Sequence, residues 1–190
     1  LLKAKAANPD AIVLSGLVDE TVRALKQSYE VGIPKSVARV ANSVASKVEV
    51  PTNAGKAAVG VSYAAAFAAS DKRPIAKKFV KKIKDKYGVV PGHDFSQMQD
   101  LLDMLRPALE KAQLKFSGNL AADRNQVRDS IASITNFTGL ASGPIGFCAA
   151  GSPECRDGNK TPVMIEYTKG GKNWKTKVAG TVTFNPSAGL

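Results

Sequence analysis

Short apolar runs alternate with helical segments over the first 65 residues, and this alternation constrains the fold more than any other feature of the sequence. Ala11–Leu14 is a continuous apolar run of strand length, and the next segment carries Val22, Leu25 and Tyr29 at helical spacing. Strands that alternate with helices form parallel sheets joined by right-handed crossovers. The sequence therefore predicts an α/β fold with a Rossmann-like, doubly wound parallel sheet and helices on both of its faces.

The same signals predict the bounds of the early elements. Leu1–Ala7 is expected to be helical, and Ala11–Leu14 is expected to be a strand buried on both faces. Asp19 or Glu20 would cap the helix that follows, and Gly32-Ile33-Pro34 would end it. Further strands are expected over Ser36–Val40 and Val59–Ala64, with a helical turn near Asn53–Ala57 between them.

The alternation of strands and helices ends after Ala64, because long helical segments follow with little strand between them. We expect helices at Pro74–Tyr87, closed by Gly88, at Asp94–Ala112, with a kink or boundary at Pro107, and at Asp123–Thr135. The remaining residues are rich in glycine, proline and β-formers. A hairpin is predicted there, with strands at Val163–Tyr167 and Trp174–Val178 joined through Lys169-Gly170-Gly171.

The chain of 190 residues carries 27 basic and 16 acidic side chains, which gives a net charge of +11 at pH 7. Its hydrophobic content of 44% is that of a folded globular chain and excludes the disordered, collagen-like and disulfide-scaffold classes. No apolar run approaches the roughly 18 to 20 residues that span a bilayer.

Many of the basic residues fall in one segment, where Ile75, Phe79, Ile83 and Tyr87 recur at helical spacing. The pattern predicts an amphipathic helix with a cationic outer face. The cations of this segment are Lys72, Arg73, Lys77, Lys78, Lys81, Lys82, Lys84 and Lys86. A solvated face explains them more simply than a dedicated binding patch. A nucleic-acid partner is not expected, because zinc ligands, RNP aromatics and helix-turn-helix spacing are lacking.

The two cysteines, Cys148 and Cys155, are close enough in sequence for a disulfide of normal geometry. Two reduced thiols, or half of a metal site, are the alternatives. His93 is the single histidine and has no ligand cluster near it in sequence, which argues against zinc. We expect the disulfide, hence an oxidising compartment, and we expect no metal and no cofactor. Leu1–Ala7 is more typical of a helix end than of a signal peptide, so a fragment or a processed piece is expected.

Patterns of catalysis are lacking in the sequence. It contains no Gly-x-Ser-x-Gly elbow and no glycine-rich phosphate loop. Asp100 and Asp103 share one face of a predicted helix, where paired carboxylates are expected to be solvated. With one histidine and no evident nucleophile, general acid–base catalysis has no support. A binding module is therefore favoured over an enzyme.

Four segments, in this order and spacing, resemble a known family. They are Asn8–Gly16, the helix end Gly32–Pro34, Phe79–Pro91, and Gly139–Phe147 with its ending Gly143-Pro144-Ile145-Gly146-Phe147. Together they resemble the C-terminal half of type I periplasmic binding proteins, the branched-chain amino acid and related solute receptors of ABC importers. The resemblance runs from Leu1 to about Val178.

The resemblance implies parts of the two lobes of such a receptor, which closes around a small-molecule solute and delivers it to an ABC permease in the membrane from the periplasm. It assigns residues 1–64 to the C-terminal lobe, 65–140 to the N-terminal lobe, and 141–190 to a hinge crossover and return. The N-terminal half of the receptor, or a second copy, is then an expected partner. A ligand-sensing regulatory domain of the same fold and a cationic nucleic-acid-binding protein are the alternative functions.

The resemblance also selects site residues in the loops at the carboxyl ends of the strands, where open parallel sheets bind ligands. They are Ser15, Gly16, Leu17, Arg39, Asn42 and Tyr63. Amino-acid receptors of the family often have an aromatic residue where this chain has Leu17 and Val18. They have a carboxylate for the ligand ammonium where this chain has Ala41 and Asn42.

These departures favour an anionic organic solute, such as an aromatic acid, over an amino acid, which is the second candidate. Arg39 would pair with the ligand carboxylate, and Ser15 and Asn42 would form neutral hydrogen bonds. Tyr63 or Leu17 would contact the apolar body of the ligand, although core packing is the other role open to Tyr63. Acidic residues at the start of the helix after the first strand would repel an anion there.

Overall fold

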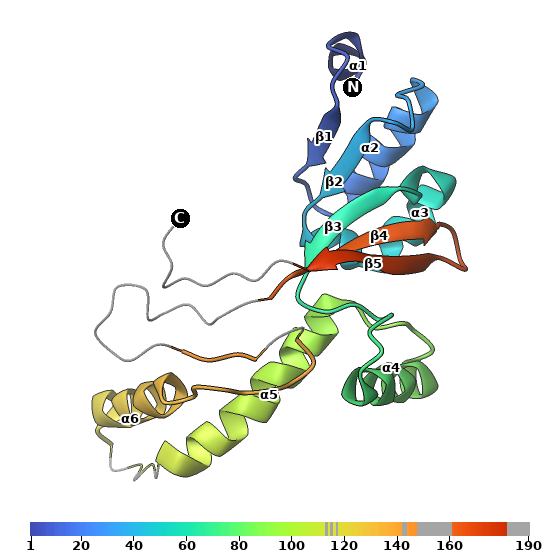
Figure 1. Ribbon diagram of the computed structural model, residues 1–190. Coiled ribbons are helices and arrows are strands. Elements are labelled where there is room, and N and C mark those ends of the chain that lie inside the picture. The colour runs from blue at the N-terminus through green and yellow to red at the C-terminus, as the bar shows by residue number, and fades with distance from the viewer. Residues whose placement is uncertain (113, 115, 117, 142–143, 148–160, 182–190) are drawn as a thin grey trace. The chain divides into compact units, whose positions relative to one another are not determined.

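The structure is a computed structural model that describes residues 1–112, 114, 116, 118–141, 144–147 and 161–181. The chain divides into two compact units, which are described separately below (Figure 1). The first comprises Leu1–His93 and Val163–Thr181, and the second comprises the described residues between Asp94 and Pro162. A unit defined by contacts within this chain is not a lobe of a whole receptor, so the lobe assignment stays a prediction. Cys148 and Cys155 lie outside the described residues, and their disulfide stays a prediction as well.

The first unit contains the strands and most of the helices. Its α-helices are α1 (Leu2–Ala6), α2 (Val18–Glu30), α3 (Glu49–Ala54) and α4 (Pro74–Tyr87). Its strands are β1 (Ala11–Leu14), β2 (Ala38–Ala41), β3 (Val61–Ala65), β4 (Val163–Lys169) and β5 (Lys175–Thr181). Two short 3-10 helices, η1 (Ser43–Ser46) and η2 (Gly55–Ala58), lie between β2 and β3 in the sequence. The α/β fold class predicted from the sequence is confirmed.

The five strands form one sheet in the order β1-β2-β3-β4-β5. The first three are parallel, with Leu14 beside Ala41 and Ala41 beside Tyr63, whereas β4 and β5 are antiparallel to their neighbours. The predicted C-terminal hairpin is therefore confirmed. Its short loop explains the antiparallel pairing, because a parallel connection needs a crossover of a dozen or more residues.

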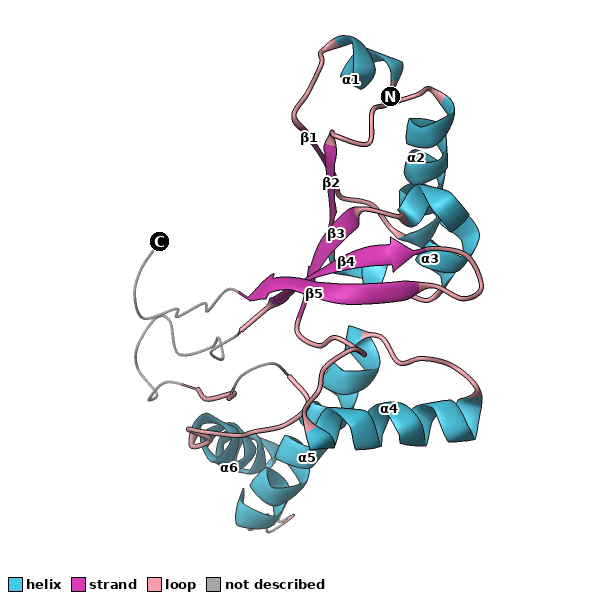
Figure 2. Ribbon diagram, turned by 45° about the vertical axis from the view of Figure 1, so that its right-hand side comes forward, coloured by secondary structure: helices cyan, strands magenta, loops and turns pink. Residues whose placement is uncertain are grey.

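Helices α2 and α3 lie on one side of this sheet (Figure 2), and the core is buried between them and the strands. The central strands β3 and β4 contribute Tyr63 and Tyr167, whose ring centroids are 5.3 Å apart, and Trp174 packs edge-on against Tyr167 at 6.0 Å.

The prediction that Ala11–Leu14 is buried on both faces is wrong. Strand β1 lies at the edge of the sheet, its residues alternate in exposure, and Val13 is 75% exposed.

The ends of α2 show which local signals decide a helix boundary. The helix begins at Val18 with Leu17 as its N-cap, so the prediction that Asp19 or Glu20 caps it is wrong: both lie in its first turn. At the other end Gly32 has a φ of 69°, the left-handed conformation that glycine adopts at low cost. The predicted stop at Gly32 is therefore confirmed.

The second unit is built around α5 (His93–Ala112) and α6 (Leu120–Ala132). Helix α5 continues through Pro107. Of the kink or boundary predicted there, the boundary is therefore wrong, and the kink stays a prediction. The Asn119 side chain caps α6 by accepting a hydrogen bond from the backbone N–H of Ala122 at 3.1 Å. None of the described helices is both long enough and apolar enough to cross a membrane.

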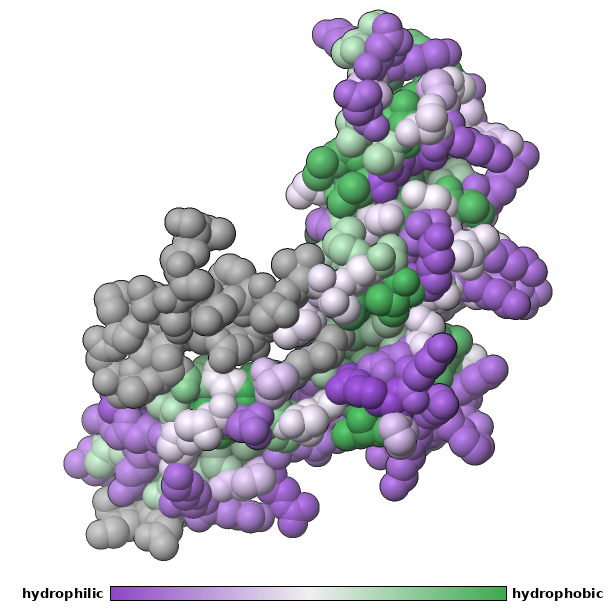
Figure 3. Space-filling view, in the orientation of Figure 1, coloured by the Kyte–Doolittle hydropathy of each residue, from purple (hydrophilic) through white to green (hydrophobic). Residues whose placement is uncertain are grey.

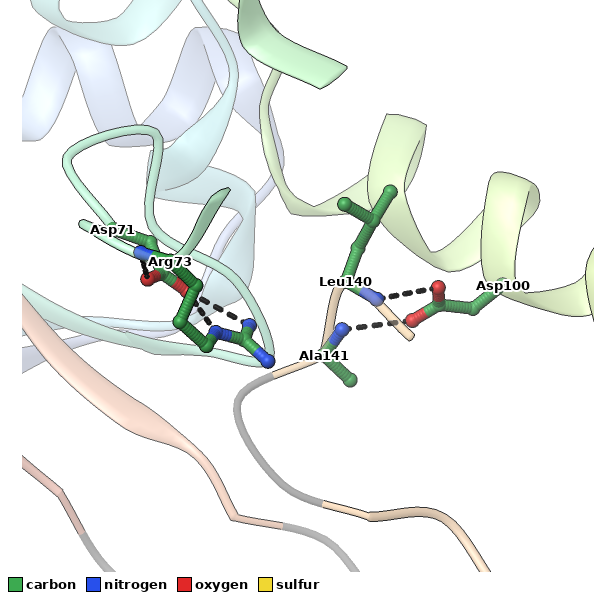
Figure 4. Close-up of polar contacts among 5 residues, drawn as sticks. All are labelled: Asp71, Arg73, Asp100, Leu140 and Ala141. Atoms are coloured by element: carbon green, nitrogen blue, oxygen red, sulfur yellow. Dashed lines mark hydrogen bonds and ion pairs between the residues drawn. The ribbon is translucent and has the colours of Figure 1, made fainter. Parts of the chain in front are cut away.

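A buried carboxylate ties α5 to a distant loop (Figure 4). Asp100 is 3% exposed, and it accepts hydrogen bonds from the backbone N–H groups of Leu140 at 2.7 Å and Ala141 at 2.8 Å. The expectation that Asp100 is solvated is wrong. Gly139 leaves the space for this contact, because a Cβ there would lie 2.2 Å from an Asp100 carboxylate oxygen.

Candidate ligand-binding site

Two loops at the carboxyl ends of β1 and β2 are held together by Asn42. The backbone N–H of Asn42 donates to the Leu14 carbonyl at 3.1 Å, and its side-chain Nδ2 donates to the Gly16 carbonyl at 3.2 Å. The parallel register makes this possible, because it pairs Leu14 with Ala41 and so brings the next residues of both strands to one edge. The structure thus brings together Ser15, Gly16, Leu17 and Asn42 of the predicted set.

The first of these loops is short and closely packed on α2. Its residues Ser15, Gly16 and Leu17 lead directly into the helix, which begins at Val18. A Cβ on Gly16 would lie 3.0 Å from the Cβ of Glu20, so a side chain at Gly16 would crowd the first helical turn. This close approach is a reason for glycine at the junction.

The start of α2 offers both donors and negative charge. The first backbone N–H groups of an α-helix have no partner within the helix, and the Leu17 side chain does not cap them. Asp19 and Glu20 are exposed in the first turn, where carboxylates interact favourably with the helix dipole. The edge can therefore donate backbone hydrogen bonds to a neutral or zwitterionic group, but two carboxylates disfavour a bare anion there.

Buried polar atoms without partners flank the same loops. Among the described residues, Oδ1 of Asn42, Oγ1 of Thr21 and Oγ of Ser46 are buried without a hydrogen-bond partner. A buried group of this kind costs free energy until a donor or acceptor reaches it. The adjoining surface is partly apolar, because Leu17 is 72% exposed, and the neighbouring Ser15 is exposed too.

Arg39 lies elsewhere in the fold. It is the second residue of β2, and its buried guanidinium donates through Nη2 to the carbonyls of Ile33 at 3.1 Å and Pro34 at 3.3 Å. Both carbonyls precede β2, at the opposite end of the strand from Asn42. The guanidinium therefore fastens the segment that enters β2, and its role as a partner for a ligand carboxylate stays a prediction that these contacts do not favour.

Tyr63 is a core residue. It is buried against Tyr167, whose hydroxyl donates to the Ala45 carbonyl. Burial raises the pKa of Tyr63 to about 12, and the hydrogen bond with Tyr167 offsets part of this rise. Burial also raises the pKa of Tyr167. The geometry favours the core-packing role of Tyr63 over contact with a ligand.

Sequence reasoning missed two features of this site. The hydrogen bond between Asn42 and Gly16 depends on the register of two strands, for which the sequence carries no local signal. The burial of Thr21 could have been predicted from the sequence. This residue lies beside Val22 and one turn before Leu25, on the stripe of α2 that is buried. A polar residue on an apolar stripe is the kind of position at which a partner is expected.

No group of three or more histidine, cysteine, aspartate or glutamate side chains is placed to hold a metal ion within the part of the chain that the structure describes. The chemistry available at the loop edge is hydrogen bonding, charge and apolar contact, which is the chemistry of reversible binding.

Comparison with known families shows that the periplasmic binding protein family matches residues 1–154 of this chain. No curated protein matches the sequence.

Solved structures give similar results. A leucine-binding protein from Thermotoga maritima is 26% identical, with a TM-score of 0.76 over 98% of this chain and 48% of that chain. A branched-chain amino acid-binding protein from Streptococcus pneumoniae, in complex with isoleucine, is 21% identical, with a TM-score of 0.72 over 92% of this chain and 45% of that chain.

A solute-binding protein of an ABC transporter from Rhodopseudomonas palustris, in complex with 3,4-dihydroxybenzoic acid, is also 21% identical, with a TM-score of 0.72 over 96% of this chain and 47% of that chain. At this identity the second and third structures show similarity of fold alone. The chain spans about half the length of all three.

Proposed function

The chain belongs to the periplasmic binding protein family, and from this premise we propose that it is part of an extracytoplasmic solute-binding protein of an ABC importer. The family and the similar structures are binding proteins rather than enzymes. The proposed partners are a small organic solute and the importer's permease in the membrane, and the proposed location is the periplasm. The lobes at residues 1–64, 65–140 and 141–190 are part of the same proposal.

The observation that carries the proposal is the joining of the loops after β1 and β2 by Asn42. In open parallel sheets, ligands bind beyond the carboxyl ends of the strands. We therefore propose that Ser15 and Asn42, with the backbone at Gly16, hold the polar part of the solute. Leu17, which is exposed beside them, would contact its apolar part.

The charges near these loops bear on the class of solute. Arg39, the cation expected to pair with a carboxylate, donates instead to the Ile33 and Pro34 carbonyls. Asp19 and Glu20 at the start of α2 would attract an ammonium group and repel an uncompensated anion. Of the two expected classes, we propose that an amino acid with an apolar side chain fits these residues better than an aromatic acid.

The test is calorimetric titration of the chain with leucine, isoleucine, benzoate and 3,4-dihydroxybenzoate. We expect the amino acids to bind more tightly than the aromatic acids. Replacing Ser15 with alanine should weaken binding about 10-fold, because one hydrogen bond is lost. Ser36 is a matched control, since it is exposed in the segment that precedes β2, and Ser36→Ala should leave the affinity unchanged.

Three results would contradict the proposal. A preference for the aromatic acids would overturn the proposed ligand class and favour an anionic solute over an amino acid. An equal effect of the two serine variants, or the absence of binding to all four compounds, would overturn the site.

A further inference from the structure

The positive charge of the chain is concentrated on one helix. Helix α4 contains six lysines and a single acidic residue, Asp85, whereas α2, α5 and α6 each mix acidic and basic residues. Figure 3 shows hydrophilic side chains over much of the region of α4. No other described helix carries a comparable excess of one sign.

The helix presents most of these lysines to solvent on one face. Ala76 and Phe79 are its buried residues, and the Phe79 ring packs edge-on against Phe67 at 5.9 Å, which attaches the inner side of α4 to the first unit. At 3.6 residues per turn, the opposite side carries five lysines. These residues, named here the lysine face, are Lys77, Lys78, Lys81, Lys82 and Lys84, and all five are exposed.

The described residues neutralise very little of this charge. Lys81 pairs with Asp85 at 2.5 Å, in an exposed pair one turn apart. The other four lysines of the face have no ion pair with any described residue. Arg73, just before the helix, is different, because its guanidinium and its backbone N–H both contact Asp71 (Figure 4).

The chemistry of the face indicates the kind of partner. Its cations are all lysine, a hydrated point charge suited to a diffuse anionic surface, and it lacks the arginine forks that grip single phosphates in a bidentate manner. The aromatic rings of α4 do not lie among these lysines: Phe79 is buried, and Tyr87, which is exposed, is the last residue of the helix and lies under the Lys86 ammonium at 5.1 Å. A row of rings on which successive bases could stack is therefore not part of the lysine face. These features favour a membrane surface over a nucleic acid.

We propose that the lysine face of α4 binds the anionic phospholipid headgroups of a membrane surface. The choice of a membrane rests on the proposed function, because a solute-binding protein of an importer works beside the membrane that holds the permease. Each lysine of a cluster near an anionic leaflet contributes to the electrostatic attraction between protein and membrane, and this attraction weakens as the salt concentration rises. Binding of this kind holds the protein near its permease without inserting any segment into the bilayer.

The test is co-sedimentation of the chain with phosphatidylcholine vesicles that contain or lack phosphatidylglycerol, without solute. We expect binding only to the anionic vesicles, and weaker binding as salt is raised. The variant K77Q/K78Q/K81Q/K82Q should bind at least about 100-fold more weakly. The matched control K169Q/K172Q/K175Q/K177Q removes the same charge from the β4–β5 hairpin and should stay within about 3-fold of the parent.

Three results would overturn the inference: equal binding to neutral vesicles, an α4 variant that binds like the parent, or an α4-dependent affinity for duplex DNA above that for anionic vesicles. Circular dichroism shows whether each variant folds. Solute titration of the α4 variant separates the two proposals. Lost vesicle binding with normal solute binding is the expected outcome, whereas vesicle binding by a parent chain that binds no solute would leave this inference standing and remove the proposed function.

Discussion

The two units of the chain differ in which residues they bury. In the first unit the buried cluster holds large side chains from strands and helices, among them Leu25, Val50, Val61, Ile165 and Tyr167. In the second unit α5 buries Ser96, Asp100, Ala108 and Ala112, and it exposes Phe95, Met98, Leu101, Leu102 and Leu109.

Hydrophobic stabilisation scales with the apolar area removed from water. Burial of apolar side chains therefore stabilises the first unit more than the second. The first unit, which carries the candidate site, is stabilised by its own core. The second depends more on polar contacts, among them the contacts of the buried Asp100 with Leu140 and Ala141. Binding loops supported by a packed sheet keep their geometry better than loops supported by a few hydrogen bonds.

The largest expected effect tests the core of the first unit. Ile165 is 1% exposed, and Ile165→Ala should lower the free energy of unfolding by about 3 to 4 kcal/mol, because it removes buried methyl groups and leaves a cavity. Leu102, which is 56% exposed on α5, is the control, and Leu102→Ala should change stability by no more than about 0.5 kcal/mol. Urea denaturation followed by circular dichroism measures both. Equal losses would remove the contrast between the units.

The next effect tests the polar attachment in the second unit. Asp100→Ala removes the carboxylate that accepts from the N–H groups of Leu140 and Ala141 and should destabilise this unit by about 2 to 3 kcal/mol. Hydrogen exchange should show both amides losing protection, while amides of β3 and β4 keep theirs. The control is Asp103→Ala, since Asp103 is exposed and accepts from Gln99 at 2.9 Å on the same helix. If Asp103→Ala exposes the same amides, Asp100 is not the attachment.

A smaller expected effect is the loss of stability at high pH, which comes from the buried tyrosines in the core of the first unit. The pKa of Tyr63 is about 12 in the folded protein and near 10 when unfolded, so below pH 10 neither state releases the proton. Between pH 10 and 12 the unfolded chain ionises first, and stability should fall by about 2 kcal/mol from this group. Tyr167 acts in the same direction, because burial raises its pKa.

Tyrosinate absorbance measures this response. Tyr29 is exposed and Lys56 lowers its pKa, so it should ionise before the buried pair. Tyr63→Phe should remove one late-ionising group. Simultaneous ionisation of all tyrosines near pH 10, with the protein still folded, would show that the pair is accessible to water.

The part of the fold that local signals determine could be predicted from the sequence. The bounds of α4 agree with the prediction because Pro74 suits the first turn and Gly88 adopts a φ of 70° after the last. Strand β2 begins two residues later than expected, at Ala38, because pairing with its neighbours decides where a strand starts. The exposure of Val13 could not be predicted, since it depends on which strand takes the edge of the sheet.

The grouping of the candidate site residues could be predicted to a similar extent. The rule that ligands bind beyond the carboxyl ends of parallel strands selected Ser15, Gly16, Leu17 and Asn42, which the structure brings together. The contacts of Arg39 could not be predicted. A strand residue can direct a long side chain toward either end of the strand, and the nearby Ile33 and Pro34 carbonyls are visible only in three dimensions.

The central claim is that the loops after β1 and β2 form one solute site on the packed sheet of the first unit. Amide NMR of the labelled chain during addition of leucine tests it most directly. The account predicts shift changes concentrated at Ser15, Gly16, Leu17 and Asn42, with Gly171 in the β4–β5 hairpin unchanged. Shift changes confined to other residues, or no change at these four at saturating leucine, would contradict it.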